Sequence, residues 1–184
     1  RIPAWCKEAK IQLNGKDYSQ EKGGKIIRIQ RAWERNDVVS IQFPTEIRTQ
    51  NWAKNSRSIE RGALIYALKI EEEVSKKIHP QEGEYLEIMP KSDWNYGILK
   101  STVKNPMTNT EWIQRGFPSE FKWSQAYSPF EIKTIGKKIP DWKTQDGVAH
   151  QPITTRTGVY EGTVNKESET IHLIPFGFTR LRVV

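Results

Sequence analysis

Alternation of apolar and polar residues with a period of two constrains the fold of this chain more than any other feature. It is clearest in residues 37–43, where Val39, Ile41 and Phe43 alternate with polar residues. Successive side chains of a β-strand point to opposite faces of the sheet, so the pattern predicts a strand with one face against a core and one in water.

The same alternation occurs in two further segments. In residues 25–33, Ile27, Ile29 and Trp33 share one face, which predicts a strand and places Trp33 in the core. Near the C-terminal end, residues 179–183 alternate in the same way with two arginines. Both segments are therefore expected to be half-buried strands.

Two segments indicate how the strands are connected and covered. Ile11 and Leu13 run into Asn14-Gly15, a pair that is typical of a tight hairpin turn. Residues 63–68 are apolar on both faces, which suits a central strand covered on both sides.

Turn-forming residues recur at short intervals, as at 23–24, 35–37, 105–106 and 146–147, and about a dozen short runs lie between them. Residues 71–78 are the one segment that could form a helix, of two turns at most. We therefore expect an all-β, antiparallel β-sandwich or jelly roll. The strand number favours two packed sandwiches, with residues 1–70 in the first and 71–184 in the second.

Composition excludes several classes of protein. The 184 residues include one cysteine, Cys6, and three separated histidines, so a disulfide and a zinc site of several thiolates are excluded. No apolar run is long enough to cross a bilayer, and no membrane partner is expected. The net charge of +7 is scattered rather than clustered, so we expect a solvated basic surface and no nucleic-acid partner.

Motifs for nucleophilic, phosphate-binding or metal-dependent catalysis are absent from the sequence, and we expect no catalytic or metal-binding residue. Glu60 beside Arg61 fits a catalytic acid with a neighbouring cation. The same pair fits a salt bridge at a strand edge, and we favour that interpretation.

The seven tryptophans are the strongest functional signal, because flat aromatic rings suit sugar rings as well as a core or a domain interface. Trp94, Asn95 and Tyr96 precede a glycine that allows close backbone approach. Trp52 lies in one loop-rich stretch, and Trp112 and Trp123 lie in another together with Phe117, Phe121 and Tyr127. We predict that these six residues contact carbohydrate or another domain: Trp94, Asn95, Tyr96, Trp52, Trp112 and Trp123.

Several short sequence motifs occur in a specific order along the chain. They are residues 1–6 with 11–15, 33–44, 60–68, 94–97, 138–142, and 173–177 with 181–182. Together they resemble segments of glycoside hydrolase family 127, the β-L-arabinofuranosidase group, over nearly the whole chain. One departure is Ala63, where the family commonly has proline.

This resemblance implies the C-terminal β-sandwich region of a larger hydrolase. In the family, a cysteine nucleophile, a zinc ion and a glutamate acid/base lie on an N-terminal (α/α) barrel. Cys6 falls in a strand string and does not match the nucleophile motif, so no catalytic role carries over. The resemblance therefore implies no cofactor in this chain and zinc only in the absent barrel.

Two classes of function follow from the sequence. The first is a non-catalytic module that supports a catalytic barrel of the same polypeptide. The second is a free-standing carbohydrate-binding sandwich. The aromatic loops and a bare strand edge at the start of the chain also predict self-association.

Overall fold

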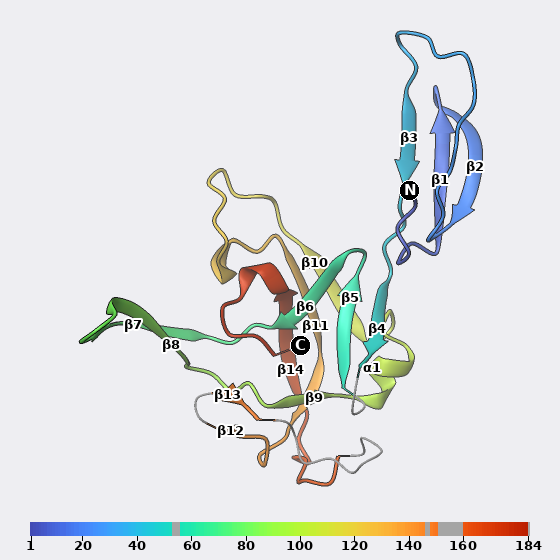
Figure 1. The fold of residues 1–184 in the computed structure, drawn as a ribbon. Coiled ribbons are helices and arrows are strands. Elements are labelled where there is room, and N and C mark those ends of the chain that lie inside the picture. Colours follow the sequence, from blue (N-terminus) through green and yellow to red (C-terminus); the bar gives the residue numbers. More distant parts are fainter. Residues whose placement is uncertain (53–55, 146–147, 151–159, 184) are drawn as a thin grey trace. The chain divides into compact units, whose positions relative to one another are not determined.

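The computed structural model describes residues 1–52, 56–145, 148–150 and 160–183. Its regular structure consists of β-strands, one short α-helix and short 3-10 turns (Figure 1). The strand pairings described below are antiparallel, which confirms the all-β, antiparallel class expected from the period-two pattern. The chain divides into two compact units, residues 1–47 with 61–63, and residues 48–60 with 64–184.

Unit 1 contains a three-stranded sheet in the order β2-β1-β3. The strands are β1 (Glu8–Leu13), β2 (Lys16–Lys22) and β3 (Val39–Gln42). Asn14 and Gly15 join β1 to β2 with φ values of 52° and 75°. Two consecutive positive φ values match the twist of the strands in a two-residue hairpin, so the expected turn is confirmed.

The core of unit 1 is built over β1. Its buried residues are Ile2, Cys6, Ala9 and Ile11, and Ile27 and Ile29 pack against them. Cys6 behaves as a small buried hydrophobe, as its apolar neighbours indicate. The residues of β3 remain exposed, so the expected half-buried face of residues 37–43 is wrong. β3 is an edge strand, and the buried cluster does not extend beneath it.

Trp33 is not a core residue, in contrast to the prediction. Its side chain is 54% exposed and lies beneath the Arg31 guanidinium, 5.7 Å from the ring centroid. Residues 25–33 form no strand. The chain then turns, because the Glu34 amide donates to Asp37 Oδ2 at 2.8 Å. The alternation of inward and outward side chains that includes Ile27 and Ile29 therefore stops before Trp33.

Unit 2 is dominated by a curled sheet in the order β10-β11-β14-β6-β5-β4, with β9 paired to the far end of β11 (Figure 1). Residues 62–63 form a tight turn between β5 and β6, with Gly62 at φ 59°. The strands are β4 (Ile47–Asn51), β5 (Arg57–Arg61), β6 (Leu64–Leu68), β9 (Tyr96–Ile98), β10 (Thr110–Gln114), β11 (Phe130–Lys138) and β14 (Glu169–Pro175).

β6 lies between β14 and β5, which confirms a central strand in residues 63–68. Tyr66, Ala67 and Leu68 are buried, whereas Leu64 and Ile65 at its start are exposed. Because β6 pairs with β14, strands from both sides of the expected boundary at residue 70 belong to one sheet. The division into two sandwiches at residue 70 stays a prediction.

The helix α1 (Lys100–Lys104) packs at one end of this sheet. The Thr102 hydroxyl lies 3.2 Å from that of Thr134 on β11, and the Val103 carbonyl accepts a hydrogen bond from Thr49 on β4. Both bonds tie the helix to strands at different positions in the curled sheet.

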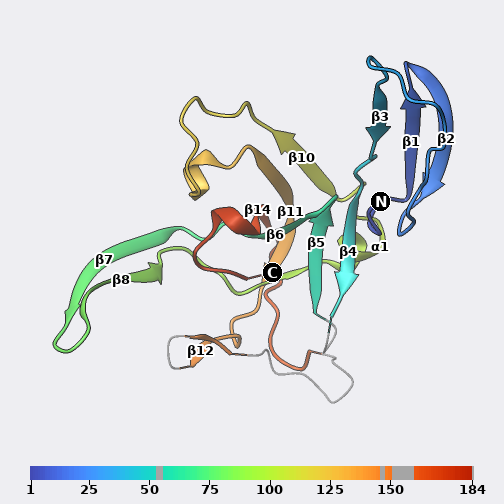
Figure 2. The same ribbon diagram turned by 45° about the horizontal axis from the view of Figure 1, so that its top comes forward.

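Residues 71–78 do not form the expected helix. They lie in a hairpin of β7 (Glu72–His79) and β8 (Gly83–Pro90), which projects away from the curled sheet (Figures 1 and 2). Val74 and Ile78 are four residues apart, a spacing that fits one face of a helix or of a strand. Residues 85–88 have the composition of a β-strand and pair with residues 74–77, and this pairing makes the segment a strand.

The remaining elements are short. They are β12 (Thr144–Gln145), β13 (Val148–Ala149), η2 (Gln125–Tyr127) and η3 (Phe176–Phe178). Residues 179–183 form no strand, but Thr179 is buried and Arg180 exposed, so the alternation does mark an inward and an outward face. The predicted turn at 146–147 lies outside the described residues.

Candidate functional site

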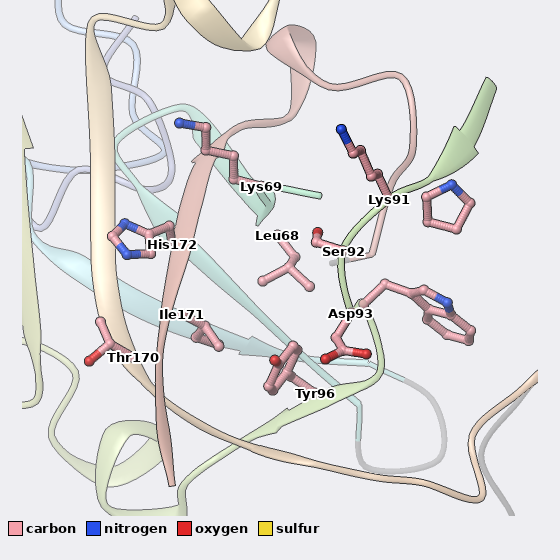
Figure 3. Close-up of a pocket in the computed structure, with 11 residues that line it drawn as sticks. Leu68, Lys69, Lys91, Ser92, Asp93, Tyr96, Thr170, Ile171 and His172 are labelled. Carbon is pink, nitrogen blue, oxygen red and sulfur yellow. The ribbon is translucent and has the colours of Figure 1, made fainter. Parts of the chain in front are cut away.

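A cavity of about 580 Å³ opens in unit 2 where β6, β14 and the segment between β8 and β9 meet (Figure 3). It is lined by Leu68 and Lys69, residues 90–94, Tyr96, and residues 170–172. In Figure 3, Asp93 and Tyr96 lie close together, and His172 lies across the cavity from them. Apolar, aromatic and charged groups are therefore combined in one opening.

Tyr96 belongs to a polar network at this cavity. Its hydroxyl donates to Glu169 Oε2 at 2.9 Å. Burial and the hydrogen bond to Glu169 raise the pKa of Tyr96 to about 12, so the phenol stays neutral and keeps its donor.

Lys138 completes the network between two carboxylates. Its ammonium pairs with Asp93 and lies 3.6 Å from Glu169 Oε1. The hydrogen bond to Asp93 is the main cause of a raised pKa for Lys138. The network therefore combines a phenol, a cation and two carboxylates, and these groups bond to one another.

Asn95 has a structural role between the two neighbouring candidates. Its Nδ2 donates to the carbonyls of Ile139 at 2.9 Å and Trp142 at 3.3 Å. Trp94 packs edge-on against Trp142, with ring centroids 5.2 Å apart. An added Cβ at Gly97 would lie 3.0 Å from Ile139 Cδ1, so the expected close approach at this glycine is confirmed.

The structure thus joins two of the sequence strings, residues 94–97 and 138–142. Tyr96 pairs with Lys138 across β9 and β11, and the Ile139 amide donates to the Asn95 carbonyl at 2.8 Å. The prediction that Trp94, Asn95 and Tyr96 contact carbohydrate or another domain remains a prediction.

Trp52 lies away from this cavity, after β4. Its indole Nε1 donates to Ser58 Oγ at 2.8 Å, and that hydroxyl donates to Glu60 at 3.1 Å. Glu60 is buried and pairs with Arg48 on the neighbouring strand. The cation that this carboxylate contacts is thus Arg48, and the pair has the structural character that we favoured over a catalytic acid.

Trp112 and Trp123 lie in two further places. Trp112, on β10, stacks on Phe130 with centroids 5.8 Å apart. Trp123 packs on Phe121 and Phe178, with both centroid distances at 4.9 Å, yet 68% of its surface is exposed. The structure therefore does not gather the candidate tryptophans into one site.

Sequence reasoning missed a buried carboxylate at the cavity edge. Glu131 on β11 accepts hydrogen bonds from His172 Nδ1 and from Arg115, each at 2.5 Å. Burial alone raises the pKa of Glu131, but the bonds from His172 and Arg115 together lower it below its usual value. No local spacing in the sequence links these residues, because the pairing of β11 with β14 brings His172 to Glu131 and the pairing of β10 with β11 brings Arg115.

Among the described residues, no group of three or more His, Cys, Asp or Glu side chains is arranged to hold a metal ion. No described helix has the length and apolar character that a membrane span requires.

Comparison with solved structures shows a likeness of fold to one longer protein. A solved structure described as "Glycoside hydrolase" superimposes with a TM-score of 0.52 over 96% of this chain, at 19% sequence identity. This identity shows the likeness of fold alone. The chain spans 24% of the length of that structure.

A family comparison gives a more particular relationship. Residues 1–45 match the family described as "Beta-L-arabinofuranosidase, GH127 middle domain". A search of curated proteins gave no match. Residues 1–45 therefore resemble the middle domain of GH127 proteins, and the chain as a whole resembles part of a longer glycoside hydrolase in fold.

Proposed function

We propose that this chain is the non-catalytic β-sandwich region of a β-L-arabinofuranosidase-like glycoside hydrolase and supports a catalytic (α/α) barrel in the same polypeptide. The match of residues 1–45 to the middle domain of that family is the observation that carries the proposal. The fold likeness over 96% of the chain, to 24% of a longer glycoside hydrolase, supports it.

The chemistry of the described residues agrees with a supporting role. The buried carboxylates Glu60 and Glu131 are each held by an arginine, so their oxygens serve the fold. Tyr96 and Lys138 are engaged by acidic partners at the cavity. In this proposal, zinc and the nucleophile belong to the barrel.

Activity and metal content test the proposal directly. The purified 184-residue chain is expected to release no aryl group from an aryl β-L-arabinofuranoside and to bind no stoichiometric zinc. A longer polypeptide that includes the barrel is the positive control in the same assays. Turnover by the short chain that is lost in Glu60→Gln would contradict a non-catalytic role.

Carbohydrate binding is the second candidate function, and the cavity that contains Trp94 and Tyr96 favours it. A supporting module is expected to bind soluble arabinose-containing oligosaccharides weakly or not at all. Calorimetry should compare the chain with Trp94→Ala, and with Trp33→Ala as a control for an exposed tryptophan outside the cavity. Millimolar or tighter binding that is lost only in Trp94→Ala would decide for the carbohydrate-binding function.

A further inference from the structure

The cavity in unit 2 is unevenly charged. Two of the residues that line it, Lys69 and Lys91, lie at the opposite end from Asp93 and Tyr96 in Figure 3. Both lysines are exposed. Within the part of the chain that the structure describes, neither ammonium group has an ion pair or a hydrogen bond. One end of the cavity therefore holds two cations without a counter-charge.

The acidic groups near the other end are already balanced. Asp93 pairs with the ammonium of Lys138, which also lies 3.6 Å from Glu169 Oε1. Asp93 lines the cavity, whereas Lys138 and Glu169 lie behind the lining. Because Lys138 neutralises Asp93, the two lysines set the net charge that a ligand meets, and that charge is positive.

Backbone hydrogen bonds fix the positions from which the two lysine side chains extend. The Lys69 amide, directly after β6, donates to the carbonyl of His172 at 2.8 Å. The Lys91 amide, directly after β8, donates to the carbonyl of Glu71 at 2.7 Å. Each side chain is a flexible four-carbon stem with three donors at its end. Both ammonium groups can therefore turn toward one anion.

Two further side chains in the lining offer hydrogen bonds. The His172 ring is held through Nδ1, which donates to Glu131 at 2.5 Å, so its Nε2 is the nitrogen left for a ligand. Arg115 balances the charge of Glu131, so this carboxylate does not cancel the lysines. Ser92 Oγ accepts a hydrogen bond from the Glu71 amide at 2.9 Å and keeps its own proton as a donor.

The other lining residues suit the body of a small ligand. Leu68, Trp94 and Ile171 supply apolar surface, and the flat indole matches the C–H face of a sugar ring. The Asp93 carboxylate can accept a hydroxyl proton in addition to its bond with Lys138. The volume of about 580 Å³ lies within the range of cavities that hold small molecules.

We propose that this cavity binds a sugar that carries an anionic group, a carboxylate or a phosphate, and that Lys69 and Lys91 bind this group. Ser92 and His172 Nε2 hydrogen-bond to the ligand, and its ring lies against Trp94. The choice of a sugar rests on the proposed relationship to glycoside hydrolases. The anionic group follows from the charge of the cavity alone.

A set of matched probes separates the anion from the sugar. D-galacturonate and D-galactose 6-phosphate carry an anion at the carbon where D-galactose has a hydroxyl group. Acetate and inorganic phosphate supply the same two anions without the sugar. Titration of the isotope-labelled 184-residue chain, followed through its amide signals by NMR, measures each dissociation constant and shows which residues respond.

We expect at least one charged sugar to bind with a dissociation constant on the order of 1 mM, and galactose to bind at least about tenfold more weakly. The amides of residues 69, 91–92 and 172 should respond, and binding should weaken as salt is added. The charged sugar that binds more tightly identifies the anion. This selectivity agrees with weak binding of uncharged arabinose-containing oligosaccharides.

Matched lysine variants test the role of the two cations. Lys69→Gln and Lys91→Gln should each raise the dissociation constant of the charged sugar about fivefold, because each removes one cation from the cavity. Lys76→Gln removes the same charge from β7, outside the cavity, and should change the constant by less than about twofold. All three lysines are exposed, and circular dichroism checks that each variant keeps the strand spectrum. Equal changes in the three variants would contradict the assignment to this cavity.

Three results of the titrations would overturn the proposal. One is the absence of binding by both charged sugars. Another is equal affinity for galactose and the charged sugars, which would leave the lysines without a role. The third is equal affinity for a charged sugar and for its anion alone, which would make the cavity a site for small anions only. None of these results bears on the aryl β-L-arabinofuranoside and zinc assays, so the proposed supporting role stands or falls separately.

Discussion

The two long hairpins of this chain have the same local design and opposite surroundings. β1 and β2 in unit 1 and β7 and β8 in unit 2 are both antiparallel pairs with a positive-φ glycine in the turn. On the first hairpin, Ile11 is 1% exposed because neighbouring segments cover it. On the second, Ile78 is almost fully exposed.

The difference teaches that apolar alternation specifies a face without specifying what covers it. In unit 1 the cover comes from Ile27 and Ile29, which follow the hairpin closely in the sequence. In the hairpin of β7 and β8, called the hairpin arm below, no segment among the described residues covers Ile78 in this way. A covered hairpin contributes to the stability of its unit, whereas an uncovered one is available for recognition.

The largest effect is expected from truncating equivalent isoleucines on the two hairpins. Ile11→Ala should lower the free energy of unfolding by about 2–5 kcal/mol, because it leaves a cavity in a packed core. Ile78→Ala should change it by less than about 0.5 kcal/mol in dilute solution, because the side chain is exposed. Urea denaturation of monomeric protein measures both. Equal losses would show that the arm is covered within its own chain.

Charged pairs extend the comparison to the rest of unit 2. Glu131→Gln should cost about 1.5–3 kcal/mol, because Glu131 is buried and accepts hydrogen bonds from two basic side chains. Glu87→Gln on the arm should cost less than about 0.5 kcal/mol, because its pair with Lys77 at 3.6 Å is exposed. Denaturant midpoints for the two variants, measured at neutral pH, test the contrast.

The same glutamate predicts a pH dependence. The pKa of Glu131 lies below 4.5 in the folded state, so its contribution is fully present above that pH and is lost as the pH falls through the folded value. Unfolding free energies measured from pH 6 downward should therefore converge for the unmodified chain and Glu131→Gln. A difference between them that grows with acidity would contradict the assignment.

Substitution of the turn glycine in each hairpin should have a smaller effect on stability, and the effect should differ between the two hairpins. Gly15→Ala should lower the stability of unit 1 by about 1–2 kcal/mol, because alanine at φ 75° is strained. Gly83→Ala imposes similar strain at φ 83°, but the uncovered arm can open locally without unfolding the sheet. Amide hydrogen exchange should show faster exchange confined to β7 and β8. Loss of protection throughout unit 2 would show that the arm and sheet unfold together.

A small effect is also expected at Trp33. Trp33→Ala should cost less than about 1 kcal/mol, because only the contact with Arg31 and part of the ring surface are lost. A loss of 3 kcal/mol or more in thermal or urea unfolding would restore Trp33 to a core and contradict the exposed position.

Much of the candidate site could not have been found from the sequence. The string at residues 94–97 does mark part of the cavity, because a glycine beside aromatic residues indicates close packing. The charged groups that contact Tyr96 come from other strands, as Glu169 and Lys138 do. Their distance from residues 94–97 along the chain hides them from any local pattern.

The sequence by itself determined the all-β class, the Asn14-Gly15 hairpin and the inward direction of Ile11, Ile27 and Ile29. These features depend on backbone geometry and on a two-residue period, which act over a few neighbouring positions. Tertiary structure alone decided that residues 72–79 form a strand, that Trp33 is exposed and that Glu131 meets His172. Each of these outcomes depends on which distant segment pairs with or covers the residue, and such pairing carries no signature in the local sequence.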